Sequence, residues 1–291
     1  ETDLVPQADV VTYDPLKGCI SIGPCRSIGG YIFVGTLGAI VREEGSNKPM
    51  LLSNYHVMCV DTNWSVGDTM AQPARNDGGT CPSDIVGTLH HGVLAGSTSG
   101  SGPGVDCAIT ELTARGHLEE IVGIGEITGT AAATPGMAVR KRGRTTELTY
   151  GTVDTVDLSA KVSYGHGIGD VTLTRQIGVD VDTSQSTIYS ASGDSGAVVV
   201  TSAGRVVGLH YAGGSGGAYG VANPIGAVTG ALGVSFYFYV GNRRTKELHR
   251  FSCYWVGQMS RHNKRYFTTV NQALSQGYNG CYYCLRGHDT G

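Results

Sequence analysis

Glycine interrupts almost every apolar run of this chain and so limits the length of its regular elements. It occupies 45 of the 291 positions, about twice its usual share of about 7%. Val and Thr recur in the short runs between the glycines, and no long helical period is present. Because β-branched residues favour strands and glycine permits tight turns, the chain is predicted to be mostly β and built from many short strands.

Charge and hydropathy argue against two broad classes of partner. Lys and Arg number 21 against 24 Asp and Glu, a formal net charge of −3, so the whole chain has no general attraction to nucleic acid or to an anionic membrane. No apolar run approaches the roughly 20 residues that a membrane-spanning helix needs. The sequence starts at Glu1 without a basic-then-apolar signal segment. We therefore expect a processed or excised piece of a longer protein, with no membrane partner.

The eight cysteines are unevenly distributed, and they are Cys19, Cys25, Cys59, Cys81, Cys107, Cys253, Cys281 and Cys284. Three lie in the last 40 residues and the other five are scattered. A secreted disulfide scaffold favours an even number at regular spacing. This distribution therefore predicts a reducing, cytoplasmic location and one metal site. Whether Cys19–Cys25 or Cys59–Cys81 pair stays open from the sequence.

Composition divides the chain into three parts. Residues 1–27 are interrupted by prolines and are predicted to form an N-terminal segment packed on the main body. Residues 28–235 alternate short apolar strands with Gly-, Ser- and Asp-rich loops, which is typical of a β domain. Near Val234–Tyr237 the composition shifts toward Tyr, Arg and Cys. Residues 236–291 are therefore predicted to form a small α+β module.

A Gly-Asp-Ser-Gly turn is the main candidate for chemistry. Ser195 lies between Asp194 and Gly196, and the chain then continues into the apolar run Ala197–Val200. Such a turn before a buried strand exposes the serine hydroxyl and aims backbone N–H groups at one point. An acyl-transfer nucleophile needs both features. The backbone N–H groups of Gly193 and Ser195 are therefore the predicted oxyanion hole.

His56 and Asp106 are the candidate partners of Ser195. His56 follows the apolar run PMLLSNY, and an imidazole can act as a base near neutral pH. Asp106 lies in the apolar run VDCAI, where a buried carboxylate needs a donor such as the His56 ring N–H. Each residue also has a plain structural interpretation, as a strand end or a cap. The rivals for the acid, of which Asp84 is the closest, are Asp84, Asp170, Asp180 and Asp182.

The surrounding motifs carry a family resemblance. In the order His, Asp, Ser, the chain is similar to the chymotrypsin-like serine proteases through GTLGAIV, LLSNYHV, VDCAI, GRTTELTYGTV, GDSGAVV, GRVVGL and GVANPI. More closely, it resembles a bacterial trypsin-like branch related to the plant NAL1-type proteins. The resemblance implies a double β-barrel over about residues 26–235 and a serine endopeptidase that cleaves proteins or peptides through catalytic His56, Asp106 and Ser195. The alternative is a catalytically quiet scaffold of this fold whose C-terminal module binds a protein or a nucleic acid.

Asp194 needs a partner of its own. In the digestive members of this family, the equivalent acid pairs with an apolar N-terminus released by cleavage, and the residues Glu-Thr-Asp at the start of this chain are unsuited to that role. Bacterial members use a basic residue in a strand similar to residues 139–146. The resemblance therefore implies that Lys141 or Arg142 pairs with Asp194, without activation by such a cleavage. The alternative is that both are solvated charges at a strand edge.

The strand after the nucleophile strand walls the primary specificity pocket in this family. Here it reads Leu-His-Tyr-Ala-Gly-Gly, and its histidine resembles that of glutamyl endopeptidases and viral 3C-type proteases, which read Glu or Gln before the cut. An imidazole can donate to a carboxylate or amide oxygen. Ser190, His210 and Tyr211 are therefore the candidate substrate-binding residues. Alternatively, His210 bonds Tyr211 or Tyr219, and the pocket reads another side chain.

The C-terminal module carries the spacing of a structural zinc site. His249-x3-Cys253 and Cys281-x2-Cys284 supply four ligands, which leave no open position for chemistry, so one structural zinc per chain is expected. The module resembles the small zinc fold at the N-terminus of the Ada DNA-repair protein. Ada uses four cysteines, one of which accepts a methyl group; the histidine here means that methyl transfer is not implied. The alternative is a Cys281–Cys284 disulfide.

The module is also basic, through Arg243, Arg244, Lys246, Arg250, Arg261, Lys264 and Arg265. These side chains permit contact with phosphate groups. A nucleic-acid partner is therefore possible but not favoured, and recruitment of a protein substrate or partner is the preferred role for the module.

Overall fold

The computed structural model describes residues 9–96 and 102–290 and contains two β-barrels. The first is an eight-stranded sheet in the order β18-β4-β5-β8-β7-β6-β2-β3. Its strands are β2 (Ile20–Pro24), β3 (Gly35–Leu37), β4 (Ala39–Glu43), β5 (Pro49–Ser53), β6 (Thr69–Ala71), β7 (Ile85–Ala95), β8 (Val105–Leu112) and β18 (Val234–Ser235). The Gly38 N–H donates to the Leu52 carbonyl at 2.8 Å. This bond brings the end of β3 back to β5 and closes the sheet around an apolar interior.

The second barrel is a seven-stranded sheet in the order β11-β16-β15-β12-β13-β14-β17. Its strands are β11 (Gly129–Thr130), β12 (Ala138–Gly143), β13 (Glu147–Ser163), β14 (Asp170–Val181), β15 (Val198–Thr201), β16 (Arg205–Gly213) and β17 (Tyr219–Pro224). β16 also pairs with β17, which closes this sheet as well. The run Val198–Val200 after the serine turn forms β15 and is fully buried.

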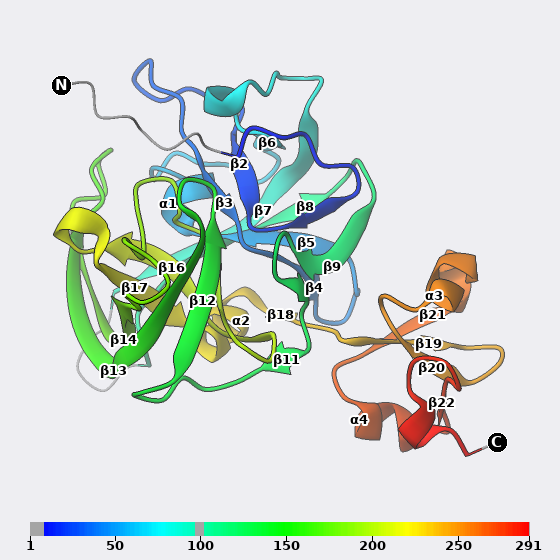
Figure 1. The fold of residues 1–291 in the computed structure, drawn as a ribbon. Coiled ribbons are helices and arrows are strands. Elements are labelled where there is room, and N and C mark those ends of the chain that lie inside the picture. The colour runs from blue at the N-terminus through cyan, green and yellow to red at the C-terminus, as the bar shows by residue number, and fades with distance from the viewer. Residues whose placement is uncertain (1–8, 97–101, 291) are drawn as a thin grey trace.

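An apolar cluster drawn from both sheets joins the two barrels. It includes Val105 and Ile109 of the first barrel and Val198 and Leu209 of the second. The prediction of a mostly β double barrel is confirmed, and Figure 1 shows the two barrels side by side, blue to cyan and green to yellow. Helices are few and short: α1 (Tyr55–Met58), α2 (Ile225–Leu232), η1 (Arg75–Asp77) and η2 (Ser215–Gly217). In the described part of the chain, no helix has the length and apolar character to cross a membrane.

The N-terminal segment is more regular than its prolines indicated. Residues 1–8 lie outside the described part of the chain. β1 (Leu16–Gly18) pairs with β9 (His117–Ile121), which also pairs with β10 (Gly125–Glu126). β2 is a strand of the first barrel rather than a segment packed on it. Proline and glycine here mark the ends of strands, which the sequence analysis treated as breaks.

The C-terminal module is a four-stranded sheet in the order β21-β19-β20-β22. Its elements are β19 (Tyr239–Asn242), β20 (Glu247–Arg250), α3 (Tyr254–Gln258), η3 (Arg261–Asn263), β21 (Lys264–Phe267), α4 (Val270–Leu274), β22 (Asn279–Gly280) and η4 (Arg286–His288). It has a small core of its own that includes Leu248, Phe267 and Tyr278. Figure 1 shows this orange-to-red module beside β9 and β4. The Arg42 guanidinium lies 3.7 Å from the centre of the Tyr266 ring and so joins the module to the first barrel.

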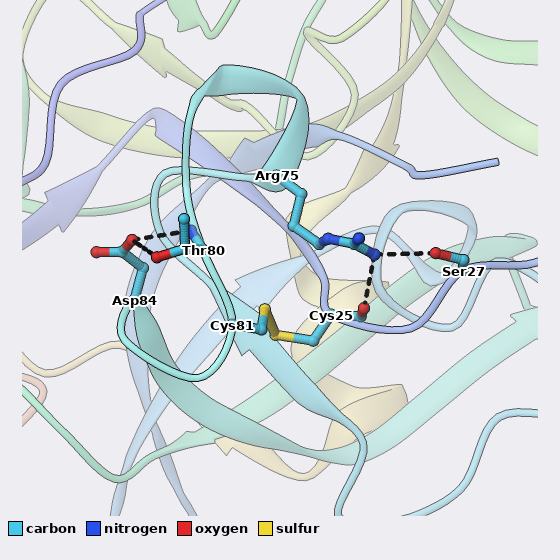
Figure 2. The surroundings of a disulfide bond; sticks show 6 residues. All are labelled: Cys25, Ser27, Arg75, Thr80, Cys81 and Asp84. Carbon is cyan, nitrogen blue, oxygen red and sulfur yellow. Dashed lines mark hydrogen bonds between the residues drawn. A yellow bond between two sulfur atoms is a disulfide. The ribbon is translucent and has the colours of Figure 1, made fainter. Parts of the chain in front are cut away.

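A disulfide that the sequence analysis did not predict ties the loop after β2 to the loop after β6. It joins Cys25 to Cys81, while Cys19 and Cys59 are free and buried, so neither pairing left open above is formed. Figure 2 shows Arg75 beside it, donating to the Cys25 carbonyl at 3.0 Å and to the Ser27 hydroxyl at 2.9 Å. The spacing of the cysteines could not reveal this pair, because the fold alone brings the two loops together.

Candidate active site

The serine turn has a backbone shape that only glycine accommodates at its two ends. Gly193 and Gly196 have φ values of 97° and 98°, in the left-handed region that favours glycine. A Cβ atom on Gly196 would lie 2.0 Å from the Thr36 carbonyl oxygen and 2.2 Å from the Ser53 hydroxyl. Ser195 between them is half-buried. The turn is therefore pressed against β3 and the end of β5 in the first barrel.

His56 and Asp106 meet as the sequence predicted. His56 belongs to α1, directly after β5, and its Nδ1 lies 2.5 Å from Oδ2 of Asp106. The His56 backbone N–H also donates to Oδ1 of Asp106 at 3.2 Å. Asp106 is fully buried on β8. A buried carboxylate with two donors from His56 holds the imidazole in one orientation and fixes its tautomer.

Two asparagines missed by the sequence analysis hold Asp106 from both barrels. The Asn54 amide donates to the Asp106 carbonyl at 2.7 Å, and Asn223 on β17 accepts the Asp106 N–H at 3.1 Å. The closest rival acid, Asp84, instead pairs with Arg115 at 3.0 Å. Asn54 and Asn223 stand in the quoted motifs LLSNYHV and GVANPI, so buried asparagines in strand motifs were the available signal.

The Ser195 hydroxyl donates its hydrogen bond to a group other than His56. Its hydroxyl donates to the Tyr211 carbonyl at 3.2 Å, and no bond from Ser195 to His56 is present among the described residues. Gly35 of β3 lies between the segments that carry the two residues: a Cβ atom there would lie 2.5 Å from the side chain of Val57, which follows His56, and 3.0 Å from the Ser195 carbonyl oxygen. Catalytic hydrogen bonds often tighten only when substrate binds, so this arrangement is compatible with a triad.

Tyr164 covers the His–Asp pair and was also missed from the sequence. Its ring centre lies 5.7 Å from that of His56, tilted by 51°. Burial, and next the charge of Asp106, raise the pKa of the Tyr164 phenol. The phenol therefore remains neutral.

The N–H groups of Gly193 and Ser195 are the oxyanion hole predicted from the sequence. The Ser192 carbonyl accepts the Thr145 hydroxyl at 2.7 Å, and the Asp194 carbonyl accepts the Ala197 N–H at 3.0 Å. In a trans peptide the N–H points opposite to the C=O. The N–H groups of Gly193 and Ser195 therefore point away from these bonds, and neither has an acceptor within the described part of the chain. Two free donors on one turn can receive a developing negative charge.

Asp194 pairs with Lys141, which resolves the choice left open by the sequence. Lys141 Nζ lies 2.8 Å from Oδ2 of Asp194, and both side chains are fully buried. Arg142 instead pairs with Asp9 at 2.7 Å. Oδ1 of Asp194 also accepts the Thr145 and Thr146 N–H groups, each at 3.0 Å. Burial alone would raise the pKa of Asp194, but the Lys141 ammonium, and next the hydrogen bond from the Thr146 hydroxyl, hold it below its usual range.

The candidate pocket residues lie deeper than the sequence indicated. His210, Ser190 and Tyr211 are all buried. His210 contacts the ring of Tyr189 with centres 6.1 Å apart, and its Nδ1 has no hydrogen-bond partner among the described residues. Burial, and next the Lys141 charge, lower the pKa of His210 to about 3. His210 is therefore a neutral imidazole with one unused nitrogen.

The four predicted zinc ligands come together in the module. One donor atom each from His249, Cys253, Cys281 and Cys284 lies within 4.8 Å of the other three. Cys253 Sγ is 3.4 Å from His249 Nδ1, and the Arg250 N–H donates to Cys284 Sγ at 3.4 Å. The three sulfurs are free thiols, so the alternative Cys281–Cys284 disulfide is not formed. One nitrogen and three sulfurs in this grouping suit a tetrahedral zinc ion.

Comparison with solved structures gives the same architecture. A glutamic-acid-specific serine protease, described as using a histidine triad in substrate binding, matches with a TM-score of 0.53 and 23% identity over 76% of this chain and all of its own. A Nocardiopsis protease matches with a TM-score of 0.52 and 17% identity, and Thermobifida fusca protease A with 0.53 and 18%; each match covers 76% of this chain and 97% of the other.

This is the fold of the chymotrypsin-like serine proteases. No protein-family model and no curated protein matches the chain. The resemblances to the NAL1-type branch and to the Ada module therefore stay predictions.

The buried ion pair provides a prediction about stability. In Lys141→Met, the Asp194 carboxylate loses its counter-charge while it stays buried, which typically costs about 3–5 kcal/mol. Since the folded-state pKa of Asp194 is depressed, its stabilisation is present above its unfolded pKa of about 3.9 and is lost as pH falls through the folded value. Without Lys141 the pKa rises, so acid unfolding begins at a higher pH.

Urea unfolding across an acid titration measures both effects. Lys161→Met is the matched control, because its ion pair with Asp170 is exposed, and we expect it to change little. Equal unfolding curves for Lys141→Met and Lys161→Met would contradict the role given to the buried pair.

Proposed function

We propose that the protein is a serine endopeptidase. The observation that carries the proposal is the hydrogen-bonded pair of His56 and buried Asp106; the two unpaired N–H donors of the serine turn add support. Ser195 Oγ attacks the peptide carbonyl carbon while His56 Nε2 takes its proton, and the oxyanion is held by the N–H groups of Gly193 and Ser195. His56 then gives the proton to the leaving amine. A water molecule repeats the sequence on the acyl-enzyme and releases the acid product.

A catalytically quiet scaffold is the second candidate. The bond from Ser195 to the Tyr211 carbonyl favours it, because the hydroxyl must rotate away before His56 can receive its proton. The buried carboxylate behind His56 favours the enzyme, because a scaffold has no need of it. Activity measurements separate the two.

Removing the nucleophile tests the proposal. Ser195→Ala should abolish cleavage of casein while the fold is kept, because Ala fits the same turn. His56→Ala should lose nearly as much, since triad members act as a unit. The control is Ser192→Ala, whose exposed side chain we expect to be dispensable. Casein cleavage by Ser195→Ala at the parental rate would rule out the proposed triad.

We further propose a preference for Glu or Gln before the cut. The support is the neutral His210 with an unpaired nitrogen on β16, together with the glutamic-acid specificity of the structural neighbour described above. A substrate carboxylate in a buried pocket needs donors, which the Ser190 hydroxyl and, in the tautomer protonated at Nδ1, the His210 ring can supply. The aromatic ring that contacts His210 belongs to Tyr189.

His210→Ala measures this preference. The value of kcat/KM should fall about 100-fold for a substrate with Glu before the cut, and change by about 3-fold or less for one with Leu, because a site built for a polar group loses most on its own substrate. His90→Ala, at a surface ion pair with Glu43, is the control. Efficient cleavage after Lys, Arg or Leu, unchanged in His210→Ala, would make His210 a structural residue.

For the module, we propose one structural zinc ion bound by His249, Cys253, Cys281 and Cys284. Four protein ligands leave no open position, so the ion would supply folding energy rather than chemistry. Four exposed aromatic side chains surround the ligand loops and suit protein recognition: Tyr254, Trp255, Tyr282 and Tyr283. Residues 236–291 hold eight Lys and Arg against two Asp and Glu. The module would therefore recruit an acidic protein substrate, and nucleic acid is the less favoured partner.

Elemental analysis tests the zinc site. One zinc per chain should co-purify and should be lost in Cys281→Ser but kept in Cys59→Ser, a buried thiol of the first barrel. Zinc loss should raise the KM for casein and leave the cleavage of short peptides unchanged. Protein purified under reducing conditions without zinc would contradict the site. The cytoplasmic location stays a prediction: thiolate ligands favour it, whereas the Cys25–Cys81 disulfide is more typical of an oxidising compartment.

A further inference from the structure

Two threonine hydroxyls bond the carbonyl groups of Ser192 and Gly193, next to the predicted oxyanion hole. Thr145, in the turn between β12 and β13, donates to the Ser192 carbonyl at 2.7 Å. Thr36, on β3, donates to the Gly193 carbonyl at 2.8 Å. Because each peptide group is planar, the Thr145 bond to the Ser192 carbonyl determines where the Gly193 N–H points, and the Thr36 bond fixes the next peptide group, between Gly193 and Asp194. The hole is therefore shaped by residues that do not belong to the serine turn.

Arg144 orients both threonine hydroxyls. Its backbone N–H donates to Thr36 Oγ1 at 2.9 Å, and its guanidinium Nη1 donates to Thr145 Oγ1 at 3.1 Å. Each hydroxyl thus accepts from Arg144 and has its own proton left for a carbonyl. The arginine also lies against the loop itself, since a Cβ atom on Gly193 would lie 3.2 Å from Arg144 Cδ.

Asp77 holds Arg144 in this position from the first barrel. The guanidinium donates twice to its carboxylate, from Nε to Oδ2 at 2.8 Å and from Nη2 to Oδ1. Oδ2 also accepts the Ser21 hydroxyl of β2 at 2.5 Å. The Asp77 side chain is 2% exposed and that of Arg144 is 13% exposed. A paired, nearly buried carboxylate and a planar guanidinium form a directional contact rather than a loose surface pair.

The geometry points to Asp77 and Arg144 as positioning residues for the oxyanion hole. The chain of contacts runs from η1 of the first barrel through Arg144 to two hydroxyls, and from these to the peptide groups on either side of Gly193. Neither residue touches the reacting atoms. The inference rests on the proposed endopeptidase function. It adds that the first barrel, which already supplies His56 and Asp106, also helps to orient the N–H donor of Gly193.

Asp77→Asn in the full chain tests the inference. Asn keeps the shape but removes the charge and one acceptor, so the guanidinium loosens. We expect kcat on a short peptide to fall about 10- to 100-fold, somewhat less than the loss of a whole oxyanion donor, with KM changed about 2-fold or less. The Ki of a peptide boronic acid, which forms a tetrahedral adduct on Ser195, should rise by the same factor as kcat/KM falls.

Two further variants keep the test decisive. Thr145→Val removes only the hydroxyl and should reproduce the loss of kcat, whereas Thr145→Ser should restore it. The matched control is Asp84→Asn, another carboxylate of the first barrel paired with an arginine but not connected to this turn. We expect its kcat and boronate affinity to match the parent.

The outcomes separate this inference from the proposed function. If the parent cleaves peptides and folded Asp77→Asn keeps parental kcat and boronate affinity, or if Asp84→Asn loses as much, the positioning role is wrong. If the parent is inactive, the endopeptidase proposal fails, and amide exchange then decides the geometry. The Thr145 and Thr146 N–H groups, bonded to Asp194, should exchange faster in Asp77→Asn than in Asp84→Asn. Unchanged exchange would overturn the contact chain.

Discussion

The buried ion pair between Lys141 and Asp194 is the contact on which the rest of the candidate site depends. Two charges without exposed surface are tolerated only when they are paired and hydrogen-bonded. The Asp194 carboxylate also accepts hydrogen bonds from the N–H groups of Thr145 and Thr146. It leaves no space for a side chain at Gly143, where a Cβ atom would lie 2.1 Å from the carboxylate. The serine turn is therefore fixed by a lysine of the same chain.

The candidate site also depends on the fold, which brings together residues that are far apart in the sequence. His56 and Asp106 come from the first barrel and Ser195 from the second, and the apolar cluster between the barrels holds them together. Asn223 crosses this boundary to hold the backbone of Asp106. The charged contacts of the serine turn cross it too, through Arg144 and Asp77. The interface between the barrels thus positions the candidate site residues as well as packing the two sheets together.

Much of this arrangement could be predicted from the sequence because it depends on local patterns. Glycine-bounded apolar runs predicted the strands, and the Gly-Asp-Ser-Gly turn predicted the candidate nucleophile. The choice between Lys141 and Arg142 could not be predicted, because neighbouring residues of a strand point to opposite faces and the sequence does not say which face is inside. The Cys25–Cys81 disulfide, Asn223 and Tyr164 are set by contacts between segments far apart in the chain. Those contacts have no local signature.

Covalent labelling with a peptide phosphonate, mapped by mass spectrometry, is the most direct test of the central claim. Such a probe reacts only with a serine whose hydroxyl is deprotonated by a base and whose oxyanion is stabilised. The account predicts one phosphonyl group per chain, on Ser195, and loss of labelling in folded His56→Ala. A folded parent that is not labelled, or one labelled equally well without His56, would contradict it.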